Sequence, residues 1–127
     1  MTHPLIEWLT EEFGWPRLDT AAGLDAWIAR PGTHVLFIPG DWRRNLETAD
    51  VAVILPELHA AFQDRFDCAV VDEAVETIAK EKAGIFKTPS LIFYRDGACL
   101  GGIPNVRDWN DYMTRVAHFL DMPVAAA

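Results

Sequence analysis

Cysteine is scarce in this sequence: among 127 residues the chain has only Cys68 and Cys99. The two are far apart, so the chain has neither a CxxC redox motif nor the paired cysteines of a zinc site. Each lies inside an apolar run, which predicts two buried free thiols. The four histidines are scattered, and none stands beside a cysteine or serine in a recognisable catalytic motif. No metal, cofactor or catalytic residue is therefore expected.

Long apolar runs and basic residues are also scarce. No stretch approaches the ~20 apolar residues that cross a bilayer, and residues 1–4 lack the basic start of a secretory signal. We therefore expect a cytoplasmic protein without membrane insertion. The 11 Lys and Arg against 19 Asp and Glu give a formal net charge of −8, which repels phosphate backbones and excludes nucleic acid as an expected partner. The acidic surplus favours a basic partner or serves solubility alone.

Half of the residues are apolar, which is enough to build one core in a chain of this length. We expect a single domain over residues 1–127, with its core at about 15–121 and residues 122–127 as a frayed tail.

Hydrophobic periodicity predicts alternating helices and strands. Helices are expected near residues 5–13, 20–30, 48–66, 73–83 and 108–120. Strands are expected at 34–38, 68–71, 90–94 and 98–100, with a brief edge strand at 15–18. Thr2 is the expected cap of the first helix, and Gly101 and Gly102 are expected to break the last strand. This order describes a mixed sheet with helices on both faces.

Residues 84–97 carry a more specific pattern: Gly84 and Ile85, then Thr88 and Pro89, then a strand and an Asp-Gly turn. The pattern resembles the thioredoxin stretch that keeps a cis-proline at this spacing, and Pro56 is similar to the proline inside the thioredoxin active-site helix. The resemblance covers roughly residues 34–120. It implies an α/β protein with a thioredoxin-like fold, a central sheet of four to five strands, an extra N-terminal helix and a cis bond before Pro89.

The thioredoxin active-site chemistry is missing. In thioredoxins a CxxC motif opens the helix after the central strand, whereas residues 40–50 here contain no cysteine. The strand at 35–38 is wholly apolar and lacks the buried acid that accepts a proton in redox thioredoxins. Dithiol exchange is thereby excluded. A thiol oxidoreductase acting through Cys68 or Cys99 alone is the remaining enzymatic alternative, but neither cysteine has an adjacent cation or a helix N-terminus to activate it.

A narrower resemblance extends over nearly the whole chain. The segments 40–41, 49–58, 95–103 and 108–112 resemble those of the HyaE/HupG/HoxO proteins, which are accessory proteins of [NiFe] hydrogenase expression and formation. The resemblance implies a non-catalytic chaperone that binds the hydrogenase small-subunit precursor through its twin-arginine signal peptide until its iron–sulfur clusters and large-subunit partner are in place. Other hydrogenase accessory proteins are further candidate partners. The alternative from the residues alone is a thioredoxin-like binding module with another client.

Two groups of residues are expected to contact the partner. They are Thr88, Pro89 and Trp42 at the groove, and the acidic residues Asp72, Glu73 and Glu76. The backbone before the cis-proline suits an added peptide strand, and the tryptophan either supplies an aromatic contact or packs beneath its own loop. The acidic residues either pair with arginines or simply complement the dipole of the helix that they begin.

Overall fold

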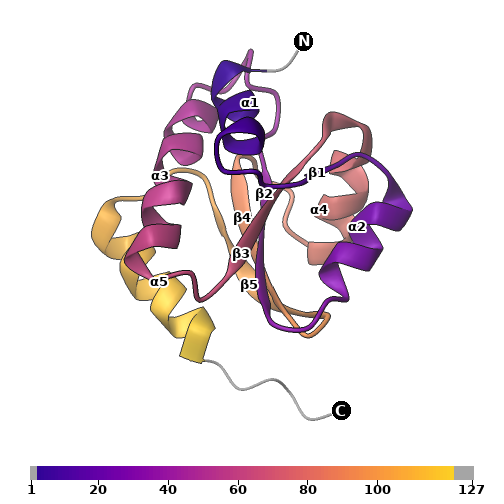
Figure 1. The fold of residues 1–127 in the computed structure, drawn as a ribbon. Helices are drawn as coiled ribbons and strands as arrows, with labels where there is room; N and C mark the ends of the chain where they lie inside the picture. Colours follow the sequence, from indigo (N-terminus) through magenta and orange to yellow (C-terminus); the bar gives the residue numbers. More distant parts are fainter. Residues whose placement is uncertain (1–2, 122–127) are drawn as a thin grey trace.

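Five strands form one mixed sheet in the computed structural model, which describes residues 3–121 (Figure 1). The strands are β1 (Arg17–Leu18), β2 (Thr33–Ile38), β3 (Asp67–Val71), β4 (Ser90–Arg95) and β5 (Ala98–Pro104). They lie in the order β1-β3-β2-β4-β5, with β1, β3 and β2 parallel and with β4 and β5 antiparallel to their neighbours. The expected mixed sheet is confirmed.

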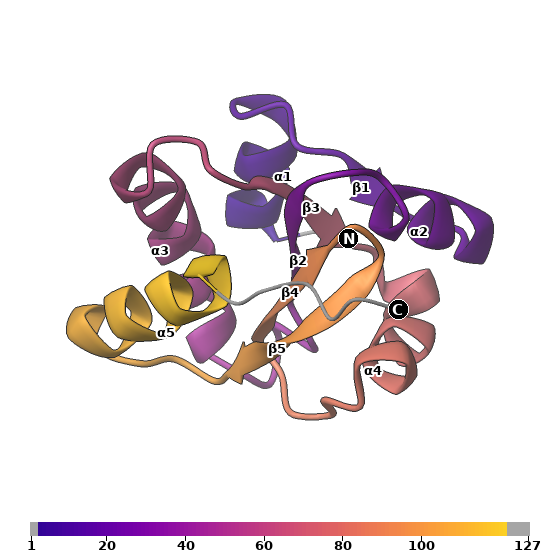
Figure 2. The same cartoon turned by 90° about the horizontal axis from the view of Figure 1, so that it is seen from below.

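Helices cover both faces of this sheet. They are α1 (Pro4–Glu11), α2 (Ala21–Ile28), α3 (Glu47–Ala61), the short 3-10 helix η1 (Glu73–Val75), α4 (Glu76–Ala83) and α5 (Trp109–Asp121). Figure 2 shows α1, α3 and α5 on one side of the sheet and α2 and α4 on the other. No helix within residues 3–121 is long and apolar enough to cross a membrane.

Strand β2 lies at the centre of the sheet and is buried on both faces. Val35 and Phe37 pack toward α1, α3 and α5, whereas Leu36 and Ile38 pack toward α2 and α4. A strand in this position needs apolar residues at every position, because successive side chains point to opposite faces. This explains why its sequence is a continuous apolar run.

Two expected boundaries are wrong. The third helix ends at Ala61 rather than at Phe66, because Gln63 and Asp64 adopt positive φ angles of 53° and 61° and turn the chain out of the helix. Gly101 and Gly102 do not break the last strand, since β5 continues to Pro104 after a register shift. The absence of a Cβ at these glycines lets Phe119 and Ile85 pack directly on the strand.

The ends of the chain are described only in part. His3 caps α1, because its Nδ1 accepts a hydrogen bond from the Leu5 backbone N–H at 3.0 Å. Thr2, the expected cap, and the expected frayed tail at 122–127 lie outside the described residues. The Thr88–Pro89 peptide bond is cis, as expected.

Candidate functional site

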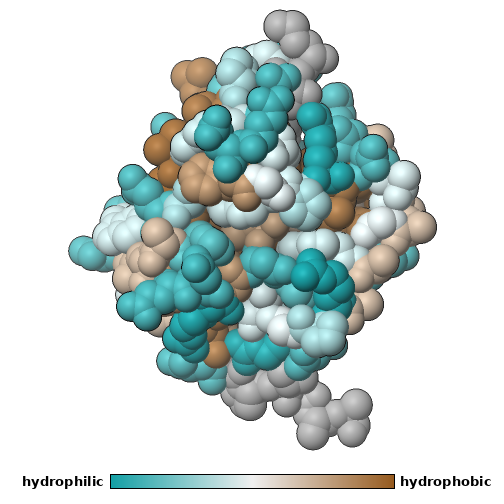
Figure 3. Space-filling model, in the orientation of Figure 1, coloured by the Kyte–Doolittle hydropathy of each residue, from teal (hydrophilic) through white to brown (hydrophobic). Residues whose placement is uncertain are grey.

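A cavity of about 340 Å³ opens at the carboxyl ends of β2 and β3. The chain leaves β2 for α3 on one face of the sheet and leaves β3 for α4 on the other. Adjacent parallel strands that diverge in this way form a crevice, and ligands of open α/β sheets bind in such crevices. The cavity is lined by Ile6, Arg17, Pro39, Gly40, Asp41, Trp42, Arg43, Val71, Asp72, Glu73 and Glu76. In Figure 3 mainly hydrophilic side chains surround this upper end of the molecule.

The fold brings the expected tryptophan and the expected acidic residues into this one cavity. Trp42 follows β2 and Asp72, Glu73 and Glu76 follow β3, and all four line the cavity. Because β2 and β3 are parallel neighbours, their carboxyl ends meet although the residues are distant in sequence. The sequence had suggested two separate groups of residues, whereas in the structure Trp42 and the acidic residues line the same cavity.

Trp42 is half-buried: it packs against residues of its own loop and of α1, and part of it lines the cavity. Its ring meets the edge of the His3 ring at a centroid distance of 5.1 Å, which packs it against α1 and its cap. The Arg43 guanidinium lies 4.9 Å from the centroid of the Trp42 ring, within the range of a cation–π contact. The indole is therefore held by its own loop and also forms part of the cavity wall.

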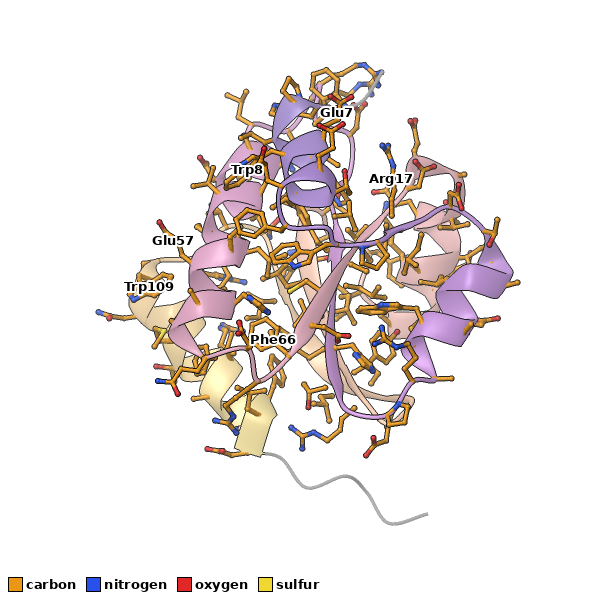
Figure 4. The ribbon with its side chains drawn as sticks, in the orientation of Figure 1. Glu7, Trp8, Arg17, Glu57, Phe66 and Trp109 are labelled. Atoms are coloured by element: carbon orange, nitrogen blue, oxygen red, sulfur yellow. The ribbon has the colours of Figure 1, made fainter. Side chains whose placement is uncertain are left out.

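The three acidic residues differ in the partners that their carboxylates already have within the protein. Asp72 accepts a hydrogen bond from Arg17 Nε at 2.8 Å and caps the Ala74 backbone N–H at 2.9 Å. The Asp72 carboxylate is therefore already paired within the protein. Arg17 lies at the cavity, between α1 and α4 (Figure 4). Glu73 is exposed and has no ion-pair partner within residues 3–121.

Glu76 is the most enclosed of the acidic residues, with a side chain only 15% exposed. Burial raises the pKa of its carboxyl group, whereas Lys80 and a hydrogen bond from the Gly40 backbone lower it and the charge of Glu73 raises it further. Lys80 Nζ lies 3.7 Å from Oε1, and this oxygen accepts no hydrogen bond within the described part of the chain. Glu76 therefore contributes to the cavity wall a carboxylate that is largely enclosed and already faces Lys80.

Thr88 and Pro89 lie beside this cavity rather than in its lining. Thr88 packs directly against Gly40, where a Cβ atom would lie 2.6 Å from Thr88 Cβ. The Thr88 carbonyl accepts a hydrogen bond from Asn45 Nδ2 at 2.8 Å. Pro89 is buried, and its carbonyl accepts from the Asn105 N–H at 2.8 Å. Of the two residues, Thr88 is the one within reach of a ligand.

Sequence reasoning missed three residues of this region. Asn45 ties the loop after β2 to the loop before β4. Leu46 and Phe86, one on each of these tied loops, are 86% and 64% exposed. The available signal was a large apolar side chain in each of two polar loops.

The two cysteines are far from this site and from each other. Cys68 lies on β3 and Cys99 on β5, with β2 and β4 between them. Cys68 is buried as expected, but Cys99 is exposed, because it lies beside the hairpin turn on an edge strand. Burial raises the pKa of the Cys68 thiol, and partial burial of the Cys99 sulfur raises its pKa although the residue as a whole is exposed. Within residues 3–121 no cluster of His, Cys, Asp and Glu could hold a metal ion.

The chain resembles hydrogenase expression proteins over most of its length. The family model of "Hydrogenase-1 expression protein HyaE" matches residues 5–112. The hydrogenase expression/formation protein HupG of Rhodobacter capsulatus is 57% identical over 119 residues, which cover 94% of this chain and 86% of that protein. HoxO of Cupriavidus necator is 39% identical over 126 residues, which cover 96% and 76%.

Solved structures agree with this assignment and establish the fold. A crystal structure of a hydrogenase expression/formation protein HupG from Rhodopseudomonas palustris has a TM-score of 0.58 at 35% identity, with 83% of this chain and 94% of that chain covered. Mitochondrial thioredoxin 3 of Saccharomyces cerevisiae has a TM-score of 0.68 at 14% identity, with 87% and 97% covered. At this low identity the second match shows the fold alone, and it confirms the expected thioredoxin-like architecture.

Proposed function

The chain belongs to the HyaE family of hydrogenase expression proteins, and on that premise we propose that it is a non-catalytic cytoplasmic chaperone for an [NiFe] hydrogenase small-subunit precursor. The proposed contact is with the twin-arginine signal peptide of that precursor. The observation that carries this proposal is the cavity after β2, the position of the reactive dithiol in thioredoxins. Here it is lined by an indole and carboxylates, which suit the binding of a cationic peptide.

The acidic wall of the cavity supports recognition of arginines. Glu73 begins η1 and Glu76 begins α4, and Glu73 is exposed and has no ion-pair partner within residues 3–121. A guanidinium group presents several N–H donors in a plane and binds carboxylates through two parallel hydrogen bonds. Adjacent arginines of a signal peptide would therefore find acceptors on this wall.

The neighbouring loops support recognition of the apolar part of the same peptide. A signal peptide has a basic segment followed by an apolar one, so a binding surface for it needs an acidic region beside an apolar region. Leu46 and Phe86 are exposed on the loops joined by Asn45 and Thr88, and Thr88 packs against Gly40 of the cavity lining. The Thr88 carbonyl retains a second lone pair for an added strand, because Asn45 uses only one.

The absence of redox catalysis is part of the proposal. Residues 40–50 contain no cysteine, and Cys99, which is exposed, has a raised thiol pKa. A thiol with a raised pKa is a poor nucleophile near neutral pH because little of it is thiolate. Turnover of insulin disulfides with a dithiol reductant at a thioredoxin-like rate would contradict the proposal.

Titration calorimetry with the small-subunit precursor and with the leaderless subunit tests the proposal. We expect tighter binding of the precursor and weaker binding at high salt, because salt screens exposed charges within ~8 to 10 Å. Trp42→Ala should cost about 2 kcal/mol, or roughly 30-fold in affinity, if the indole anchors the peptide. Glu73→Gln should cost less, because charges at a rim tune association rate more than affinity.

Two matched variants control for these changes. Trp109 is also an exposed tryptophan and Glu57 an exposed glutamate, and both lie on the α3 and α5 side, away from Arg17 at the cavity (Figure 4). Trp109→Ala and Glu57→Gln should leave the affinity unchanged. Equal affinity for precursor and leaderless subunit, with no effect of Trp42→Ala, would contradict signal-peptide binding and favour a client contact elsewhere.

A further inference from the structure

The outward face of α3 carries a line of apolar side chains. Leu46, Val53 and Ala60 are spaced by seven residues, which is close to two turns of a helix. Leu46 directly precedes α3 and already has helical backbone angles, with φ −68° and ψ −22°. Leu46 and Val53 are 86% and 44% exposed, and Ala60 is exposed as well. The three side chains therefore follow one another along the outside of the helix.

A row of carboxylates runs beside this line. Asp50 and Glu57 are also seven residues apart, and each comes four residues after an apolar member of the line, so they lie on the same side of the helix. Both are exposed, and neither has an ion-pair partner within residues 3–121. Residues 45–64 contain no Lys or Arg. This segment therefore has no cation of its own to balance the two charges.

The start of α5 adds a large aromatic side chain to the same side of the molecule. Helices α3 and α5 lie next to each other in Figure 1 and in Figure 2, and Figure 4 shows Glu57 and Trp109 on the outer side of these two helices. Trp109 is 41% exposed. Leu46, Val53 and Trp109 are thus three of the six large apolar side chains that are exposed in the described residues. Exposed apolar groups that gather in this way mark interaction sites.

This arrangement is typical of one half of a helix pair. Apolar residues at seven-residue spacing form the seam between two packed helices, and the charges beside the seam select the partner. The opposite face of α3 is already occupied, because Val51, Leu55 and Leu58 pack in the core. A second copy of this chain that docked through the same face would set carboxylates against carboxylates, which repel. The fitting partner therefore carries lysine or arginine beside its apolar residues.

We propose that the outward face of α3, together with Trp109, docks a helix of a second protein, and that this helix presents apolar residues flanked by lysine or arginine. The inference goes beyond the proposed function, because Val53, Glu57 and Trp109 do not line the cavity. A signal peptide in the cavity and a helix on α3 can therefore be bound at the same time. Leu46 is shared with the apolar region proposed for the signal peptide, so the test leaves it unchanged.

The test uses two fluorescein-labelled model helices, LKKLLKLLKKLLKL and LEELLELLEELLEL, with binding followed by fluorescence anisotropy. The two probes share one apolar face and carry opposite charges, and we expect only the lysine helix to bind. Val53→Ser should weaken its binding about fivefold, because the exposed part of the valine loses its apolar contact. Ile78→Ser is the matched control. Ile78 is 38% exposed but lies on α4, so its replacement should leave the affinity unchanged.

The row of carboxylates is tested separately from the apolar line. A variant with both Asp50→Asn and Glu57→Gln should bind the lysine helix about two- to fivefold more weakly at low salt, as expected for two exposed ion pairs. A variant with Glu11→Gln and Glu12→Gln is the control for net charge, because it removes two exposed carboxylates at the end of α1. It should leave the affinity nearly unchanged.

NMR locates the bound probe. The indole N–H signal of Trp109 should shift during titration with the lysine helix, whereas that of Trp42 in the cavity should not. Equal binding of the two probes, equal effects of Val53→Ser and Ile78→Ser, or a shift of the Trp42 signal alone would overturn the proposal. A dimer of the free protein that Val53→Ser dissociates would also overturn it. A precursor that binds through its leader while Val53→Ser and Ile78→Ser behave alike would refute only the docking face and not the proposed function.

Discussion

Replacement of Gly40 by alanine tests the contact that joins the cavity to the loop before β4. Gly40 has a φ of 75°, where an L-residue with a side chain is strained by about 1–2 kcal/mol. The new methyl group would also lie 2.6 Å from Thr88 Cβ. That atom is attached to the backbone and cannot swing away, so the overlap adds about 1–3 kcal/mol. The expected loss is about 2–5 kcal/mol, from a total that is about 5–15 kcal/mol in typical domains.

Gly84→Ala is the matched control for this change. Gly84 has a nearly equal φ of 69°, and a Cβ atom built there meets nothing within 4 Å, so its replacement carries the backbone strain without the overlap. Urea unfolding followed by far-UV circular dichroism gives both free energies of unfolding. We expect Gly40→Ala to be the more destabilised variant by about 1–3 kcal/mol. Equal losses would refute the close approach of Gly40 and Thr88.

Two further outcomes follow from the pKa shifts. Burial raises the folded-state pKa of Glu76 above its usual value, so the folded state binds more protons and this residue's contribution to stability falls as the pH rises through that range. Glu76→Gln should therefore gain stability relative to the parent between pH 4 and pH 7 in urea titrations, and the reverse trend would contradict the assignment. Cys99 is exposed and Cys68 buried, both with raised thiol pKa values. Alkylation near neutral pH should therefore add one group slowly to the native protein and a second only after unfolding, as mass spectrometry would show; two native adducts would refute this placement.

Most helices and strands were predicted correctly, because apolar periodicity and helix capping depend on residues that are adjacent in the sequence. The apolar run at 35–38 reflects a strand covered on both faces, and the observed strand is Thr33–Ile38. The second helix was expected to begin at Thr20, and the Thr20 side chain caps it by accepting a hydrogen bond from the Gly23 N–H. The errors arose where a distant contact decides the local structure. Gly101 stays in a strand because β4 pairs with it and Phe119 packs against it.

The exposure of a residue was harder to predict than its secondary structure. Cys99 stands in an apolar run, yet it lies on β5, the edge of the sheet, and is exposed. Pro89 was expected at a contact surface, but it is buried while Thr88 before it remains within reach. In both cases the exposure depends on whether an element from a distant part of the chain packs over the residue. The neighbouring residues in sequence therefore say little about it.

The sequence by itself determined the type of fold and the absence of dithiol chemistry, because apolar periodicity, the Thr88-Pro89 pattern and a loop without cysteine are all local properties. Only the tertiary structure decided how the site is composed. Trp42 and Glu73 line one cavity because β2 and β3 are parallel neighbours whose carboxyl ends meet. The same pairing brings the loop after β2 to the acidic residues Asp72, Glu73 and Glu76, which follow β3. No local pattern encodes this meeting, since it depends on the order of the strands in the sheet.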